Sequence, residues 1–365
     1  VDRSYGGATV FDADGTTSSI DFVGNENTFV LDVSSEFDFM GFSHDPMYTD
    51  DSEVVVLEGS VGSGVRSIEF GESSSATEDW DVVSFNGLDS GVTLDLSYLN
   101  SNYEAVATTS TAQTVVYVDG AEGVFGTSQS DSITGDSARN ILHGGDGTDS
   151  VSGGAGQDLI SGGLGSGDTV FGGAGEDILI DLDGGNLYGD DSYGEIREDD
   201  TFVAGQNTTI QDFDLSPDGA GLSGRSNQVN DIVFVQVTAA SLAAAGFSLN
   251  EIYELVSGDE GPGSNQWRDF VRDLEVEVVD DTTTGNAYNE IRLRIDGDGD
   301  GQATDIGSVS FLEAGTGSGN YNAVKMKTQL EQILAQFEST ASDNAHVLEQ
   351  FYGMDTLTAS QLAAL

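Results

Sequence analysis

The stretch that decides the fold is GGDGTDSVSGGAGQDLIS, residues 144–161. It divides into two nine-residue units of the pattern GGxGxDxUx, in which U is an apolar residue. Such a unit is too short to bury its own apolar side chain, so a run of units is stable only when the copies stack on one another. The stretch therefore predicts a stacked, repetitive β structure.

The repeat extends beyond this stretch in both directions. An acid or amide recurs every nine residues, apart from one unit at 162–171 that holds an extra residue. The positions in phase are Asp131, Asn140, Asp149, Asp158, Asp168, Asp177 and Asn186. A flexible Gly/Ser linker would lack this phasing of acids and apolar residues, so we reject that alternative.

Each part of the unit suits a hard cation. Glycine tolerates positive φ and lets carbonyl oxygens approach an ion, while the aspartate supplies charge. Calcium takes about 6–8 oxygens in loose geometry, magnesium requires a strict octahedron, and zinc prefers His or Cys. We therefore expect several calcium ions. The predicted ligands are Asp131, Asn140, Gly145, Gly147, Asp149, Gly154, Gly156, Asp158, Gly163, Gly165, Asp168, Gly173, Gly175, Asp177 and Asn186.

Two units are expected to make one turn, so that residues 18 apart line one edge. The first edge would carry Asp131, Asp149, Asp168 and Asn186, and the second Asn140, Asp158 and Asp177. The xUx triplet after each loop is predicted to be a short strand with its middle side chain turned inward. Binding should be weaker at 140 and 186, where Asn replaces Asp.

These nonapeptides resemble those of the RTX, or haemolysin-type, calcium-binding repeat proteins of the type I secretion class. The flanking segments are also similar to that family, at 81–85, 92–96 and 122–127 before the repeats and at 200–203, 209–213 and 230–233 after them. The resemblance implies a right-handed parallel β-roll. It also implies a bacterial protein that is exported to the extracellular space or cell surface by an apparatus reading an uncleaved C-terminal signal.

The whole chain is predicted to be mainly β, with an α+β region near its C-terminus. Short apolar runs separated by Gly, Ser, Asn and Asp indicate a β-sandwich-like region over 1–120. The calcium roll follows over 121–200, a roll-capping and secretion-associated α+β region over 201–320, and a helical segment over 321–365. Helical spacing is visible at 238–256 and 321–338, and 290–295 is predicted to be a strand.

The charge balance excludes some partners. With 64 acidic and 11 basic residues the formal net charge is -53, which disfavours nucleic acid and anionic membranes. Either bound divalent cations or high ambient salt must offset the repulsion between carboxylates. The chain has no cysteine, and no window of 18 or more apolar residues predicts a transmembrane segment.

A second acidic motif, DGDGDG at 296–301, resembles the start of an EF-hand loop. We reject an EF-hand because Gly307 stands at the twelfth position, where that motif requires a bidentate Glu. Two alternatives stay open: a single calcium loop formed by Asp296, Asp298 and Asp300 with Asp305 as a further ligand, or a plain acidic turn. The acids at 12, 14, 50 and 51 are expected to be solvated turns.

The sequence lacks the best-known catalytic motifs, while a carboxylate pair for glycoside chemistry stays open among its 64 acids. There is no HExxH zinc helix, GxSxG elbow, phosphate-binding GKS/GKT loop or nucleophilic cysteine, and His143 is expected on a strand face. The leading hypothesis is a calcium-dependent structural or adhesive protein that self-associates or contacts a cell surface. A secreted carbohydrate-active enzyme or polysaccharide-binding module is the alternative, and an export domain that folds outside the cell is compatible with both.

Overall fold

The computed structural model is mainly β, with one short helix among the residues that it describes. These are 10–11, 21–22, 27–32, 40–42, 53–61, 67–70, 81–99, 104–109, 113–190, 200–205, 207–213, 231–249, 251, 273–280 and 288–313. The chain divides into two compact units. The first comprises Val1–Asp181 and Gly185–Thr201, and the second Leu182–Gly184 and Phe202–Leu365.

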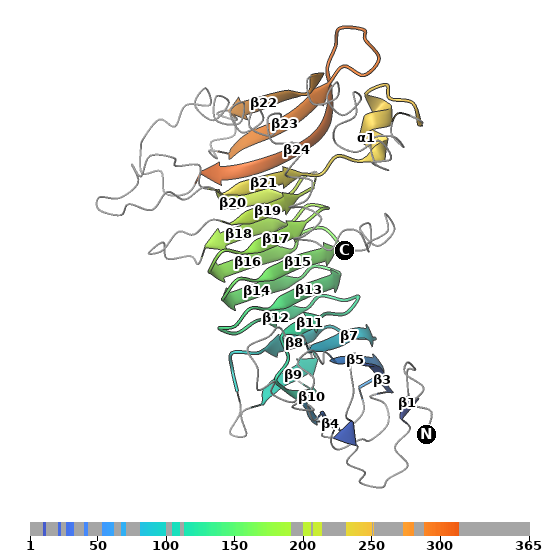
Figure 1. Ribbon diagram of the computed structural model, residues 1–365, viewed down its shortest axis with the longest axis vertical. Coiled ribbons are helices and arrows are strands. Elements are labelled where there is room, and N and C mark those ends of the chain that lie inside the picture. The colour runs from blue at the N-terminus through green and yellow to red at the C-terminus, as the bar shows by residue number, and fades with distance from the viewer. Residues whose placement is uncertain are drawn as a thin grey trace, which may run out of the picture. The chain divides into compact units, whose positions relative to one another are not determined.

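The first unit is built from two β-sheets whose strands alternate along the chain, apart from the three successive strands β8, β9 and β10, so that the chain passes repeatedly from one sheet to the other (Figure 1). One sheet, which we name sheet A, has the order β1 (Val10–Phe11), β3 (Asn27–Asp32), β5 (Glu53–Gly59), β7 (Val82–Leu88), β11 (Gly123–Phe125), β13 (Ile141–Asp146), β15 (Leu159–Leu164) and β17 (Ile178–Asp181). Each of its neighbouring pairs is parallel.

The other sheet of this unit, sheet B, has the order β2 (Asp21–Phe22), β4 (Met40–Phe42), β6 (Ser67–Glu69), β10 (Thr114–Asp119), β9 (Ala105–Thr109), β8 (Val92–Asp95), β12 (Ser132–Thr134), β14 (Ser150–Ala155), β16 (Thr169–Ala174) and β18 (Asn186–Asp190). Its pairs are parallel except for β8–β9 and β9–β10, which are antiparallel.

The core of the roll is a thin stack of the apolar residues predicted to point inward. In sheet A the column is Val124, Leu142, Ile160 and Leu179, and in sheet B it is Ile133, Val151, Val170 and Leu187. All eight are at most 1% exposed. Because a strand alternates its side chains, the two neighbours of each inward residue lie on the outer face.

The register confirms that two nonapeptides make one turn. Leu142 pairs with Ile160, 18 residues on, whereas Ile160 pairs with Leu179 and Val151 with Val170, each 19 residues on. The extra residue lies in the unit at 162–171, as its sequence predicted. The mainly β fold class with a parallel roll is therefore confirmed.

The region before residue 120 differs from the expected sandwich. Its strands β3, β5 and β7 pair in parallel with one another, and β7 pairs in parallel with β11 across the expected boundary. Among the described residues of this region, only β8, β9 and β10 form the antiparallel pairing that a sandwich would use throughout. The parallel coil thus begins well before the glycine-rich repeats, and long apolar strands build it there.

The second unit contains β19 (Thr201–Ala204), whose first residue belongs to the first unit, and β20 (Thr209–Phe213), β21 (Ile232–Val235), α1 (Ala239–Ala244), β22 (Glu275–Asp280), β23 (Tyr288–Ile295) and β24 (Thr304–Glu313). Strand β24 pairs in parallel with β20 and antiparallel with β23, which pairs with β22. The strand predicted at 290–295 is confirmed as part of β23.

Two small cores hold this unit. Phe213 lies edge-on to both Phe202 and Phe311, with ring centroids 6.1 and 5.5 Å away. Helix α1 packs Leu242 against Ile295 and Ile306. Helix α1 ends at Ala244 because Gly246, with φ +98°, follows its C-cap residue Ala245, and residues 252–256 of the predicted helical segment lie outside the described residues. The helix predicted at 321–338 lies outside the described residues.

Candidate metal centre

Buried carboxylates form a ladder along one edge of the roll. The backbone N–H of Asp131 donates to Asp149 Oδ1 at 2.7 Å, and that of Asp149 donates to Asp168 Oδ1 at 2.8 Å. The three aspartates are 5%, 2% and 0% exposed. The structure thus brings Asp131, Asp149 and Asp168 together on the edge predicted for them.

The opposite edge repeats the arrangement. Asn140 N–H donates to Asp158 Oδ1 at 2.7 Å, and Asp158 N–H donates to Asp177 Oδ1 at 2.8 Å. This ladder continues to Asp200, whose Oδ1 accepts from Asp177 N–H at 2.9 Å. Sequence reasoning missed Asp200 in this role because it lies 23 residues after Asp177 rather than 18.

Asp149 and Asp158 each keep one oxygen that no protein donor satisfies. Their Oδ2 atoms are buried and lack a hydrogen-bond partner, while Oδ1 is held in the ladder. The pKa of both carboxyls is raised to about 7, chiefly by burial and in part by neighbouring carboxylates, which are Asp131 and Asp168 beside Asp149 and Asp177 beside Asp158. A buried, charged oxygen of this kind requires a cation or a proton.

The glycines of the repeat explain why these oxygens lack donors. Asp149 and Asp158 each follow, by four residues, a glycine with positive φ, at +113° for Gly145 and +102° for Gly154. Gly173 has the same relation to Asp177, and Gly163 precedes Asp168 by five residues because this unit holds the extra residue. The second glycine with positive φ in each loop has φ +134° or +135°, at Gly147, Gly156, Gly165 and Gly175. Positive φ reorients the peptide groups of the loop, so its carbonyls can face an ion.

The loops also stack so closely that only glycine fits. A Cβ on Gly163 would overlap the carbonyl oxygen of Gly145, and one on Gly165 would overlap that of Gly147. A Cβ on Gly172 would lie 2.5 Å from Asp177 Oδ2. The glycine backbone beside each buried aspartate provides carbonyl oxygens, and the aspartate provides carboxylate oxygens. Calcium requires both kinds of ligand, so the residues present fit this ion.

The two degenerate loops before residue 141 satisfy their polar groups differently. Asp131 Oδ2 accepts from Thr127 N–H at 2.6 Å, and its Oδ1 accepts from Val92 N–H at 2.5 Å. Asn140 Oδ1 accepts from Asp136 N–H at 2.8 Å. Thr127 and Asp136 stand where later loops have Gly145 and Gly154, and neither has positive φ. Protein donors therefore hold the oxygens for which we had predicted calcium.

The predicted position of Asn186 is wrong by one residue. Asn186 pairs with Thr169 rather than lying beside Asp168, because the step from Val170 to Leu187 is 17 residues. Its loop instead contains Asp181, whose Oδ1 accepts from Gly185 N–H at 2.8 Å. Carboxylate oxygens of Asp181 and Asp168 lie within 4.8 Å of each other, and the two residues are 1% and 0% exposed.

Sequence reasoning missed Asp181 because it occupies the place of the first glycine of its unit. The motif DLDGG at 181–185 was a usable signal, since an acid there departs from an otherwise regular GG. Two buried carboxylates at this separation repel each other strongly unless a cation lies between them. Asp181 is therefore a candidate calcium ligand at the end of the first edge.

The acidic loop of the second unit is held by its own backbone. Ligand oxygens of Asp296, Asp298 and Asp300 lie within 4.8 Å of one another, as a calcium loop would require. However, Asp296 Oδ1 accepts from Gly299 N–H at 2.9 Å, and its Oδ2 accepts from Gly301 N–H at 2.8 Å. These bonds satisfy a plain acidic turn, so a calcium site in this loop stays a prediction.

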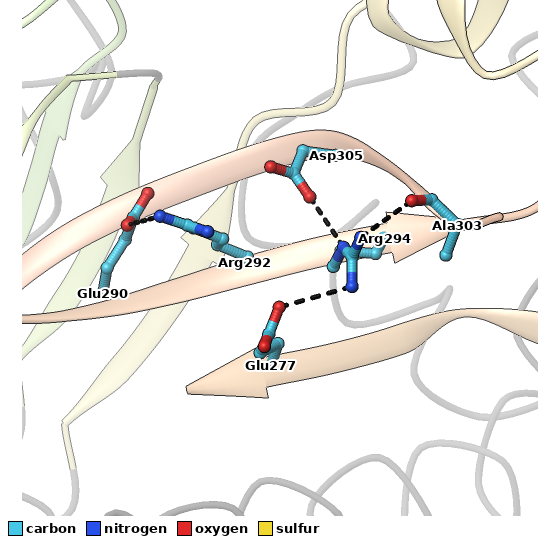
Figure 2. Close-up of polar contacts among 6 residues, drawn as sticks. All are labelled: Glu277, Glu290, Arg292, Arg294, Ala303 and Asp305. Atoms are coloured by element: carbon cyan, nitrogen blue, oxygen red, sulfur yellow. Dashed lines mark hydrogen bonds and ion pairs between the residues drawn. The ribbon is translucent and has the colours of Figure 1, made fainter. Parts of the chain in front are cut away.

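Asp305 does not join that acidic loop. Its Oδ1 accepts from Arg294 Nε at 2.8 Å, and the same guanidinium reaches Glu277 at 3.4 Å and the carbonyl of Ala303 at 2.8 Å (Figure 2). Our prediction of Asp305 as a further ligand is therefore replaced by an ion pair between β23 and β24. The acids at 12, 14, 50 and 51 lie outside the described residues.

His143 lies on the outer face of β13, as predicted. Its ring meets Phe125 edge-on at 5.7 Å, and burial lowers its pKa. Its neutral ring thus packs as an aromatic side chain.

Comparison with known proteins identifies the same region as a calcium-binding repeat. Residues 125–160 and 134–167 match the family model of the RTX calcium-binding nonapeptide repeat, which describes four copies. No curated protein matches the chain. Among the described residues, no helix has the length and apolar character that a membrane span requires.

Proposed function

Since the segment 125–167 consists of RTX calcium-binding repeats, we propose that this chain is a secreted structural or adhesive protein that folds and assembles when calcium fills the roll. The observation that carries the proposal is the pair of buried carboxylate ladders. Their Oδ2 atoms at Asp149 and Asp158 need a cation before the roll can close around them. Calcium is thus part of the fold rather than an addition to it.

Folding depends on the calcium concentration of the compartment that contains the chain. Where calcium is scarce, the carboxylates repel one another and the glycine-rich loops recover too little energy to offset their ordering entropy. At the roughly millimolar calcium of extracellular sites, the binding free energy becomes folding free energy. A protein built this way stays unfolded during export and folds at its destination.

A structural role agrees with the rest of the described chain. Most of it is a stack of strands whose side chains form a continuous core, and the net charge of -53 keeps chains apart until cations bind. An extracellular layer, filament or matrix subunit uses both properties. Calcium would then control assembly as well as folding.

The test compares the full chain in 10 mM calcium with the same chain in a chelator, by circular dichroism and by sedimentation velocity. We expect β structure and larger particles with calcium, and an expanded monomer without it. Unchanged spectra and particle size would refute the proposal. Incubation with a panel of polysaccharides tests the alternative, since release of reducing ends or unsaturated products would identify an enzyme instead.

A further inference from the structure

The outer face of sheet A is apolar along the calcium-binding part of the roll. Its outward positions include Phe125, Ile141, Leu159, Ile178 and Ile180, which we name the apolar face. The register aligns Ile141, Leu159 and Ile178 in one column and brings Phe125 and Ile180 into the column beside it. All five are partly exposed, whereas the residues between them point into the core.

The equivalent face of sheet B has one column with aromatic residues, Phe171 and Tyr188, and one column that is polar. The column that corresponds to Ile141, Leu159 and Ile178 consists there of Ser132, Ser150, Thr169 and Asn186. Polar side chains of this kind can hydrogen-bond with water, so they require no apolar partner. The two outer faces of one roll have therefore diverged, although the repeat unit that builds them is the same.

Charge decides what can cover the apolar face. The five residues and the others in their two columns between β11 and β17, which are Gly123, His143 and Ser161, carry no carboxylate. In a chain of net charge -53, a surface strip without acids is where a second equally acidic molecule can approach. An anionic membrane would be repelled by the surrounding acids, and a basic partner would prefer those acids to this strip.

We propose that the apolar face is the surface on which two copies of this chain associate, face to face, once calcium has formed the roll. The proposal rests on the calcium-dependent assembly proposed above and names the surface that mediates it. A two-fold arrangement places each column against its own copy, so an uncharged apolar column is self-complementary.

The size of the face suits a reversible contact. The four strands of this face, β11, β13, β15 and β17, hold 3, 6, 6 and 4 residues. At about 3.3 Å per residue and about 4.8 Å between strands, they give about 300 Å² per copy and about 600 Å² for the pair. This total lies below the size of stable specific interfaces, so the contact is expected to be weak and the dimer to form only at high micromolar concentrations of the chain. Many weak, repeated contacts of this kind suit a layer or a filament.

Calcium controls this surface because it orders the strands that carry it. Leu159 directly follows Asp158, and Ile178 directly follows Asp177, so these two face residues are each joined to a ladder aspartate. Without calcium the loops that set the register of β13, β15 and β17 are not held. The same ion therefore creates both the fold and its contact surface.

The experiment compares Leu159→Glu with the matched control Thr169→Glu in 10 mM calcium, by sedimentation equilibrium over micromolar concentrations. Both residues directly follow a ladder aspartate and add the same charge, but they lie on opposite sheets. We expect Leu159→Glu to raise the dimer dissociation constant at least ten- to a hundred-fold, about what loss of one buried leucine produces. Thr169→Glu should leave it unchanged.

Circular dichroism of both variants in calcium shows whether each has folded, and Leu159→Ser replaces Leu159→Glu if that variant does not fold. Dimerisation of the folded face variant at the wild-type dissociation constant would overturn this inference while leaving calcium-dependent assembly standing. A wild type that folds with calcium yet stays monomeric would overturn both. An equal rise of the dimer dissociation constant in Leu159→Glu and in Thr169→Glu would show a general effect of added charge and would also overturn this inference.

Discussion

Replacing Asp149 by Asn separates the calcium-binding role of this carboxylate from its structural role. Asn keeps Oδ1, which accepts from Asp131 N–H at 2.7 Å, so the ladder of backbone bonds survives. It replaces the buried Oδ2, which has no hydrogen-bond partner, by an amide group that cannot bind a cation. The substitution thus removes one ligand and one negative charge with little change in shape.

The expected effect follows from linkage between binding and folding. A single site with calcium at a hundred times its dissociation constant stabilises the fold by about 2.7 kcal/mol, which the variant should lose. The dependence of unfolding free energy on calcium should fall by about 1.4 kcal/mol per tenfold concentration. In chelator the variant should be no less stable than the wild type, because it no longer buries an uncompensated charge.

The assay is urea unfolding, followed by circular dichroism, at a series of calcium concentrations. Asp131→Asn is the matched control, because both oxygens of Asp131 accept from protein donors, from Val92 and Thr127. It should cost about 1–3 kcal/mol at every calcium concentration without changing the slope. Equal slopes for wild type and Asp149→Asn would refute the assignment of Asp149 as a ligand.

Three further predictions concern protons, glycines and the missed aspartate. Between the unperturbed pKa of 3.8 and about 7, the calcium-free fold binds protons at Asp149 and Asp158 that the unfolded chain does not, so acidification should stabilise the calcium-free roll. Protons should also compete with calcium, so the calcium midpoint of folding should rise from pH 8 to pH 6, and a midpoint independent of pH would contradict the raised pKa values. Gly156 has φ +135°, and a Cβ there would lie 2.8 Å from the Ala138 carbonyl carbon, so Gly156→Ala should lower the free energy of unfolding in calcium by several kcal/mol, measured with urea. Gly167→Ala is the control and should lower it less, because Gly167 has φ +98° but its nearest neighbour would be 3.7 Å away. Asp181→Asn should stabilise the chain in chelator and weaken calcium binding in isothermal titration, and a change in neither quantity would exclude it as a ligand.

The repeat could be predicted from sequence because its chemistry is local. Each GGxGxD loop contains its own strained glycines and its own acid, so the phase alone placed Asp149 and Asp158 on opposite edges. The inward column of Ile160 and Leu179 followed from the same phase. A single inserted residue was visible because the phase resumes at Asp177.

What could not be predicted depends on contacts distant in sequence. Asp131 has the sequence position of a calcium ligand, but its Oδ1 accepts from Val92, 39 residues earlier. The parallel pairing of β5 with β7 is equally non-local, and apolar runs such as 54–57 suit either a sandwich or a parallel coil. Asp305 lost its predicted role to Arg294, a partner that only the pairing of β23 with β24 brings near.

The roll therefore uses two solutions to the same electrostatic problem. At Asp131 and Asn140, a residue without positive φ four positions earlier donates its N–H to the polar side chain, so no ion is needed. At Asp149 and Asp158, the residue four positions earlier is a glycine with positive φ, and the buried Oδ2 has no hydrogen-bond donor. This oxygen therefore requires calcium. The change from Thr or Asp to Gly at one position of the unit thus converts a turn whose polar side chain is satisfied by protein donors into a turn that folds only with calcium. Because the self-satisfied turns lie next to the apolar coil at the N-terminal side, they offer the calcium-dependent turns an edge with fixed register on which to stack.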